Sequence, residues 1–136
     1  MIETDNQIIL NEEYRPDGYR SEKWTPSAQQ AQEALGAIRN YIDTVEFIET
    51  SQEYTDINYI KEHFQDYKVQ FVGFEYEGKK KIWCNFIHTS FFDTQEEQER
   101  WTQNIIMVMD GGKDFWQLEF EPETNEITKF FINGES

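Results

Sequence analysis

The chain is poor in the residues that form disulfides, bind phosphates or cross membranes. Its 136 residues include one cysteine, and 12 lysines and arginines stand against 27 aspartates and glutamates. One cysteine cannot form an internal disulfide, which excludes the framework of a small disulfide-stabilised secreted domain. The formal net charge of −15 argues against a protein that follows nucleic-acid phosphates and against adsorption to an anionic membrane.

Long hydrophobic runs are also missing. The uninterrupted apolar stretches are short, such as Ile105 to Met109, so no segment is predicted to span a bilayer. Residues 1–10 are acidic and polar around the triplet Ile8 to Leu10, which is not the pattern of a secretory signal. We therefore expect a cytoplasmic protein, although a removed signal peptide would leave the same sequence.

Aromatic residues, by contrast, are plentiful. They make up 16% of the chain, with four Trp, seven Tyr and eleven Phe. Each buried aromatic side chain removes roughly 150–250 Å² from water, so a few of them build a sizeable core. The length fits one domain. We expect an irregular segment over residues 1–24, with a turn at 15–18 and room for a short strand at 8–10, followed by one domain over 25–136.

The strongest helix signal begins near residue 25. Thr25 suits an N-cap and Pro26 suits the first helical position, where the missing N–H is not needed. Apolar residues then recur at spacings of three and four, the pattern of a helix with one buried face. They are Ala28, Ala31, Leu35, Ile38, Ile42 and Val45. Gly36 lowers helix propensity by about 1 kcal/mol relative to alanine, so we expect it to mark a close approach to a strand.

Two further segments carry helix-start signals. Residues 50–66 are ambiguous, but Asp56 is a candidate cap for a short helix. Asp93 with Glu96 three residues later has the arrangement of a capping box.

The apolar period changes to two from residue 69 onward, which predicts strands. The predicted strands cover residues 69–76, 81–88, 105–109, 115–121 and 127–132. Short turns separate most of these strands, including Glu77 to Lys79 and the Asp110 to Gly112 turn, whose glycines suit positive φ. The fold class is α+β, with one long amphipathic helix on a four- to five-stranded antiparallel sheet. By analogy the arrangement is cystatin-like or nuclear-transport-factor-like, and such an analogy carries no function.

Short motifs at the element boundaries resemble those of a group of small uncharacterised bacterial proteins. They are Trp24-Thr25-Pro26-Ser27, Phe71-Val72-Gly73-Phe74, Asn85-Phe86, Asp110-Gly111-Gly112 with Phe115-Trp116, and Ile132-Asn133-Gly134-Glu135. The resemblance covers residues 24–135 and implies a helix followed by antiparallel strands. It implies no activity.

Candidate reactive residues have plainer explanations. Cys84 and His88 share a strand face, but four residues of strand separate them by roughly 13 Å, which is too far for a nucleophile–base pair. His63 with Glu62 and Asp66 is typical of a helix surface rather than a metal site. We therefore expect no catalytic residues, no metal site and no cofactor.

Two other groups of residues also have plainer explanations. The loop from Asp110 lacks the ligand and glycine positions of a calcium loop. Lys79, Lys80 and Lys81 lie at a hairpin turn, where lysines protect strand edges and favour solubility; a small anion site is the minor alternative.

The candidate binding residues lie on the predicted strands. Trp83 and Trp116 belong to strands that carry large apolar groups on both faces, and one of those faces is either covered or an exposed patch. Glu75 and Glu119 are the acids placed inside strands, where an inward-facing carboxyl group would indicate a pocket.

Two functions from different classes follow. The first is a non-enzymatic acidic binding protein, of the inhibitor or immunity type, that covers a basic protein. The alternative is a small-molecule-binding domain with a pocket between helix and sheet. The acidity also has a simpler explanation in solubility. The sequence does not indicate the oligomeric state.

Overall fold

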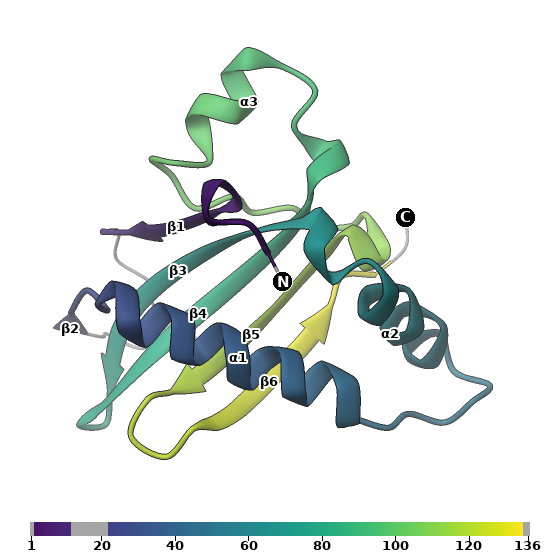
Figure 1. Cartoon of the computed structure of the whole chain (residues 1–136), viewed down its shortest axis with the longest axis horizontal. Helices are drawn as coiled ribbons and strands as arrows, with labels where there is room; N and C mark the ends of the chain where they lie inside the picture. Colours follow the sequence, from purple (N-terminus) through teal and green to yellow (C-terminus); the bar gives the residue numbers. More distant parts are fainter. Residues whose placement is uncertain (1, 12–21, 135–136) are drawn as a thin grey trace.

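In the part of the chain that the structure describes, a six-stranded sheet carries two helices on one face and a third, short helix at its edge (Figure 1). The computed structural model describes residues 2–11 and 22–134. The strands are β1 (Gln7–Leu10), β2 (Glu22–Lys23), β3 (Tyr67–Tyr76), β4 (Lys79–His88), β5 (Phe115–Glu121) and β6 (Glu126–Ile132). The helices are α1 (Ala28–Thr44), α2 (Gln52–Glu62) and α3 (Gln95–Arg100). Among these helices, none combines the length and apolar character needed to cross a membrane.

The strand order is β1-β3-β4-β5-β6, with β2 also paired to β3. The pairs from β3 to β6 are antiparallel, whereas β1 runs parallel to β3. The first part of the chain was expected to be irregular, but it contributes β1 and β2 to the edge of β3. The short strand expected at 8–10 is present in β1, and the turn expected at 15–18 lies outside the described residues. The α+β class is confirmed, with a mostly rather than fully antiparallel sheet.

α1 lies across the sheet because its apolar stripe is buried against the strands (Figure 1). Leu35, Ile38 and Ile42 are at most 1% exposed, as their spacing predicted. Under them, the Phe86 and Trp116 rings stack at 3.8 Å between centroids. The expected N-terminus was wrong: the helix begins at Ala28, and Ser27 caps it through a capping box with Gln30.

The other two helices also begin earlier or later than expected. Ser51 caps α2 and accepts a hydrogen bond from the Tyr54 N–H, while Asp56 lies buried inside the helix. Thr94, not Asp93, caps α3. In both helices a hydroxyl side chain caps instead of the carboxylate expected from the sequence, and it accepts from an N–H group of the first turn.

The β3–β4 hairpin is confirmed, and Glu77 and Gly78 form its turn at positive φ. Gly73 is required by a close approach, since a Cβ there would collide with the Trp24 carbonyl oxygen. The strand expected at 105–109 was wrong, because that segment pairs with no strand. The glycines Gly111 and Gly112 do take positive φ, but they lead through a short 3₁₀ turn into β5 rather than closing a hairpin.

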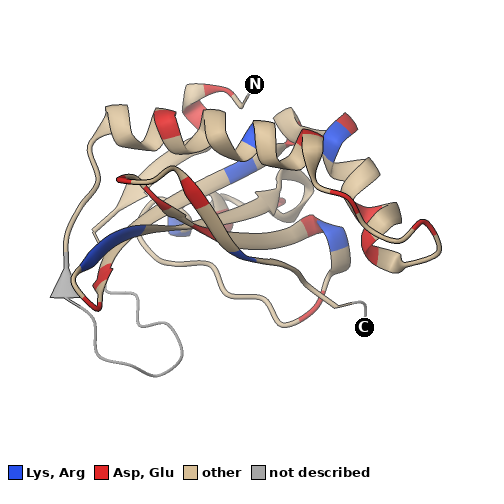
Figure 2. Cartoon of the chain, turned by 90° about the horizontal axis from the view of Figure 1, so that it is seen from below, with Lys and Arg blue, Asp and Glu red and all other residues tan. Residues whose placement is uncertain are grey.

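The segment 101–110 covers the sheet face opposite α1, and Figure 2 shows irregular chain running beneath the strands there. Hydrogen bonds from side-chain amides hold this segment against the sheet, where a strand would be held by backbone pairing. Gln70 donates to the carbonyls of Trp101 and Asn104 at 2.7 and 2.8 Å and accepts from the Ile106 N–H. Asn85 donates to the Ile106 carbonyl at 2.8 Å, and Asn133 to that of Val108 at 2.6 Å. We call residues 101–110 the amide-held segment.

Candidate functional site

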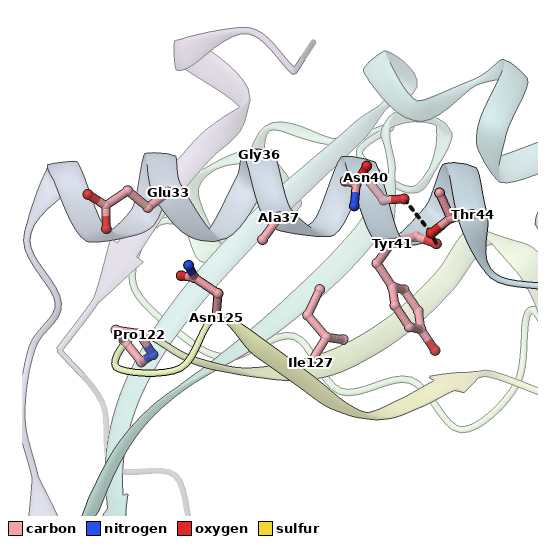
Figure 3. A pocket seen from close by; sticks show the side chains of 9 residues that line it. All are labelled: Glu33, Gly36, Ala37, Asn40, Tyr41, Thr44, Pro122, Asn125 and Ile127. Atoms are coloured by element: carbon pink, nitrogen blue, oxygen red, sulfur yellow. Dashed lines mark hydrogen bonds between the residues drawn. The ribbon is translucent and has the colours of Figure 1, made fainter.

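A groove of about 740 Å³ runs between α1 and the turn that joins β5 to β6 (Figure 3). It is lined by Glu33, Gly36, Ala37, Asn40, Tyr41, Thr44, Pro122, Asn125 and Ile127. The helical residues recur every three or four positions, so they form one flank of α1 beside its buried stripe. Many of the lining residues, including Glu33, Asn40 and Asn125, are exposed, so the groove is open to solvent.

Gly36 lies in the wall of this groove and has no partner in the described chain. A Cβ built there meets no atom within 4 Å, so the predicted close approach to a strand was wrong. The residue still costs the helix about 1 kcal/mol relative to alanine. The space that its missing side chain leaves open faces the groove and is free for another molecule.

The opposite wall is positioned by the β5–β6 turn. Asn125 adopts a φ of 60°, and its N–H donates to the Glu121 carbonyl at 2.8 Å. Asparagine tolerates this left-handed conformation better than most residues. The turn brings Asn125 beneath α1, with its side chain directed toward the helix (Figure 3).

The two ends of the groove differ in character. At one end Glu33 is the charged lining residue, and one of its oxygens accepts from the Gln29 amide at 3.2 Å. At the other end Tyr41 and Ile127 point toward each other from helix and strand (Figure 3). The Tyr41 ring packs edge-on against Phe130 at 5.6 Å, and burial raises the Tyr41 pKa.

The sheet-and-helix core beside the groove is filled with side chains. The binding residues expected from the sequence all lie outside the groove. Trp116 is fully buried in the core under the helices. Glu75 is half-buried near the β3–β4 turn, at the end of the hairpin.

Trp83 and Glu119 come together on the opposite sheet face, where they are register neighbours on β4 and β5. Glu119 is 2% exposed, and its oxygens lie 3.7 Å from the Lys81 ammonium and 3.9 Å from that of Lys129. The structure therefore divides the four predicted residues among three places.

Cys84 and His88 each have other partners. Cys84 is fully buried, and burial raises its pKa, which disfavours the thiolate. The His88 ring accepts from the Ser90 N–H through Nδ1 and lies 3.2 Å from the Tyr59 hydroxyl through Nε2.

His63 lies against the same tyrosine. Its ring stacks on Tyr59 at 4.2 Å, and its Nδ1 lies 3.1 Å from the Asp66 carboxylate. Among the residues that the structure describes, no three His, Cys, Asp or Glu side chains gather as a metal site. The packing of both histidines around Tyr59 was not predicted, because it depends on how α2 meets the end of β4.

The basic side chains of the described residues are mostly turned onto the chain itself. Lys79 and Lys81 lie 3.9 and 3.7 Å from the Glu121 and Glu119 carboxylates. Others lie over rings: Arg39 over Phe64, Lys68 over Trp101, Lys80 over Trp24 and Lys113 over Tyr59.

Most acids, in contrast, point to solvent. Exposed acids with no ion pair to another described residue are Glu3, Asp5, Glu33, Glu46, Glu49, Glu53, Glu62, Glu77, Asp93, Glu96, Glu99, Asp110, Glu123 and Glu126. Figure 2 shows acidic positions along α1, around α2 and on the β5–β6 turn. The surface field is therefore negative, and local cations do little to offset it.

Sequence reasoning missed the groove residues. Gly36 was the one signal, since a glycine inside an amphipathic helix suggested close approach. Comparisons with protein-family models, with curated proteins and with solved structures give no significant match. The candidate site is thus defined by its geometry and charge.

Proposed function

We propose that this chain is a non-enzymatic acidic binding protein whose partner is a basic protein, as an inhibitor or immunity-type protein would be. The observation that carries the proposal is a difference between the two charges: most of the described cations contact the chain's own carboxylates and rings, whereas most of the described acids are exposed and have no ion pair to another described residue. Such a field speeds encounter with a basic surface and rejects acidic ones. We propose the groove beside α1 as the contact site.

The open groove favours a polypeptide over an enclosed ligand. Small-molecule sites usually bury 70–90% of the ligand surface, which exposed walls such as Asn40 and Asn125 do not provide. Gly36 leaves room for the close approach of a backbone.

The second candidate is the small-molecule-binding domain. Its supporting observation is the groove volume of about 740 Å³, which falls in the usual range for ligand sites, about 300–1,000 Å³. It differs from the pocket expected from the sequence, because the groove is open to solvent and its wall opposite α1 is formed mainly by the β5–β6 turn. The cystatin-like or nuclear-transport-factor-like comparison stays an analogy of architecture.

Affinity capture with charge-matched variants tests the first proposal. The groove variant carries Glu33→Gln, Glu123→Gln and Glu126→Gln. The control carries Asp93→Asn, Glu96→Gln and Glu99→Gln at α3, which lies at the far edge of the sheet (Figure 1). Both variants lose three charges. We expect the parent and the control to capture the same basic protein at low salt, and the groove variant to capture much less.

Two results would contradict the proposal. One is a captured partner with an acidic surface, and the other is equal loss of capture in both variants. Saturable binding of a small metabolite, with no protein partner, would support the second candidate instead.

A further inference from the structure

We propose that the groove beside α1 binds an extended segment of its partner that carries a lysine or arginine four residues from a large apolar residue. The inference rests on the proposed function and gives the chemistry of the occupant. It follows from the charge, width and length of the groove.

The charge of the groove selects a cation at one end. No lysine or arginine is among its lining residues, and Glu33 is the acid among them. Glu123 and Glu126 are exposed and flank Asn125 in the sequence, but they are not among the lining residues. A lysine or arginine side chain placed at this end therefore meets Glu33 at the groove wall, and the two acids of the turn add to the negative field around it.

The other end selects an apolar side chain. Tyr41 and Ile127 are half-buried there, and Phe130 supports the tyrosine ring. An aromatic or branched aliphatic side chain laid over them removes apolar surface from water on both molecules.

The middle of the groove suits a backbone. Gly36 and Ala37 present little side chain, and a Cβ at position 36 would find 4 Å of open space. Asn40 and Asn125 add exposed amides, which can both donate to and accept from peptide groups. The chain itself shows this mode of binding, since Gln70 and Asn85 hold the backbone of the amide-held segment.

The length of the groove sets the spacing. Glu33 and Tyr41 are eight positions apart, which corresponds to about 12 Å along α1. Four residues of extended chain cover about 13 Å, and residues an even number apart point to the same side. The lysine or arginine and the apolar residue are thus four positions apart, and the intervening backbone passes Gly36.

Addition of the segment to the sheet edge is disfavoured. β6 is the last strand in the sheet order, but Lys129 takes a φ of 55° within it and the pairing with β5 shifts register there. This bulge bends the outer edge, so a long regular ladder cannot form on β6.

Titration of ¹⁵N-labelled protein with short synthetic peptides tests the inference. The probe is an acetylated, amidated five-residue peptide with lysine first, phenylalanine fifth and serine between them. The control has the same composition, with lysine and phenylalanine adjacent. We expect the probe to shift the amide signals of Glu33, Gly36, Asn125 and Ile127 in a saturable way, and the control to bind at least about fivefold more weakly.

Two variants separate blockage from misfolding. Gly36→Gln places a side chain across the middle of the groove, and it should weaken the probe about tenfold or more. Glutamine is a better helix former than glycine, so this variant should be more stable than the parent. Glu33→Gln should weaken the lysine probe about two- to fivefold and leave a probe with norleucine in place of lysine unchanged.

The outcomes distinguish the inference from the function on which it rests. If a natural basic partner binds Gly36→Gln as tightly as the parent, the groove assignment is overturned, while the proposal that the protein binds a basic partner stands. If the two peptides bind equally, or neither shifts the groove signals at millimolar excess, the spacing inference is overturned. Failure to find any basic partner, together with binding of a small ligand, overturns both.

Discussion

Single residues in this protein show how burial controls chemistry. Cys84 has the reactivity of a core residue: it is fully buried, and its Sγ lies 3.7 Å from the Ile82 carbonyl oxygen. Because burial raises the pKa of this thiol, the thiolate is scarce in the folded protein near neutral pH. The thiolate is the nucleophile in alkylation.

We therefore expect Cys84 to resist iodoacetamide at pH 8 in the native protein and to react readily in denaturant. The neutral thiol predominates at every pH below the thiol pKa of the folded protein. Because burial raises that pKa, Cys84 should be less reactive at pH 8 in the folded protein than in the unfolded chain. Mass spectrometry of the alkylated protein measures the modified fraction. Rapid native labelling with an unchanged circular-dichroism spectrum would show an accessible, activated thiol.

Gly36 gives a second prediction at this scale. Its φ is not positive and a Cβ there meets no neighbouring atom, so Gly36→Ala should raise the free energy of unfolding by about 0.5–1 kcal/mol. Urea denaturation of the variant measures it. Gly73→Ala is the matched comparison and should destabilise strongly, because its Cβ collides with the Trp24 carbonyl. A lower midpoint for Gly36→Ala would show that α1 needs the glycine for its own packing.

At the scale of elements, the amide-held segment depends on side chains rather than on a strand ladder. Asn85 is 2% exposed and donates to both Gln70 Oε1 and the Ile106 carbonyl. Asn85→Ala leaves those acceptors short of a donor in a buried site, which should lower the free energy of unfolding by about 1–3 kcal/mol.

The readout that identifies this mechanism is local. Hydrogen exchange in residues 101–110 should speed up more than exchange in β3 or β4. Asn40→Ala, at an exposed site on α1, should stay within about 0.5 kcal/mol of the parent. Equal loss of protection over the whole sheet would mean that Asn85 serves only global stability.

The same elements show what can be predicted from sequence. The α1 stripe and the β3–β4 hairpin were predicted because local period and turn chemistry determine them. Residues 105–109 form a short apolar run that is typical of a strand, but Gln70 and Asn85 on β3 and β4 bond the backbone groups that a neighbouring strand would have bonded. Strand formation depends on a partner, and the sequence of one segment does not show which partner is near.

The groove escaped prediction for the same reason. It needs Gly36 on α1 and Asn125 on the β5–β6 turn to face each other, and they are far apart in the chain. Gly36 was the one signal in the sequence, and it gave no indication of what lies opposite. Their juxtaposition is a property of the tertiary structure.

At the scale of the molecule, charge controls association. The net charge of −15 projects a field over a Debye length of about 8 Å at physiological salt. The association rate with a basic partner should therefore fall about tenfold or more between 50 and 500 mM salt. Stopped-flow fluorescence measures this rate. The association rate of the charge-reduced groove variant should depend less strongly on salt. A parent rate that does not change with salt would indicate that the acidity serves solubility and not association.

The parallel pairing of β1 with β3 has a consequence for biosynthesis. Gln7 pairs with Val69, so β1 leaves the ribosome about sixty residues before the strand with which it pairs. Until then Ile8, Ile9 and Leu10 have no sheet to join, whereas the β3–β4 hairpin closes locally as soon as its turn is made. The sheet therefore forms first from its later strands, and β1 is added to an edge that those strands have already formed.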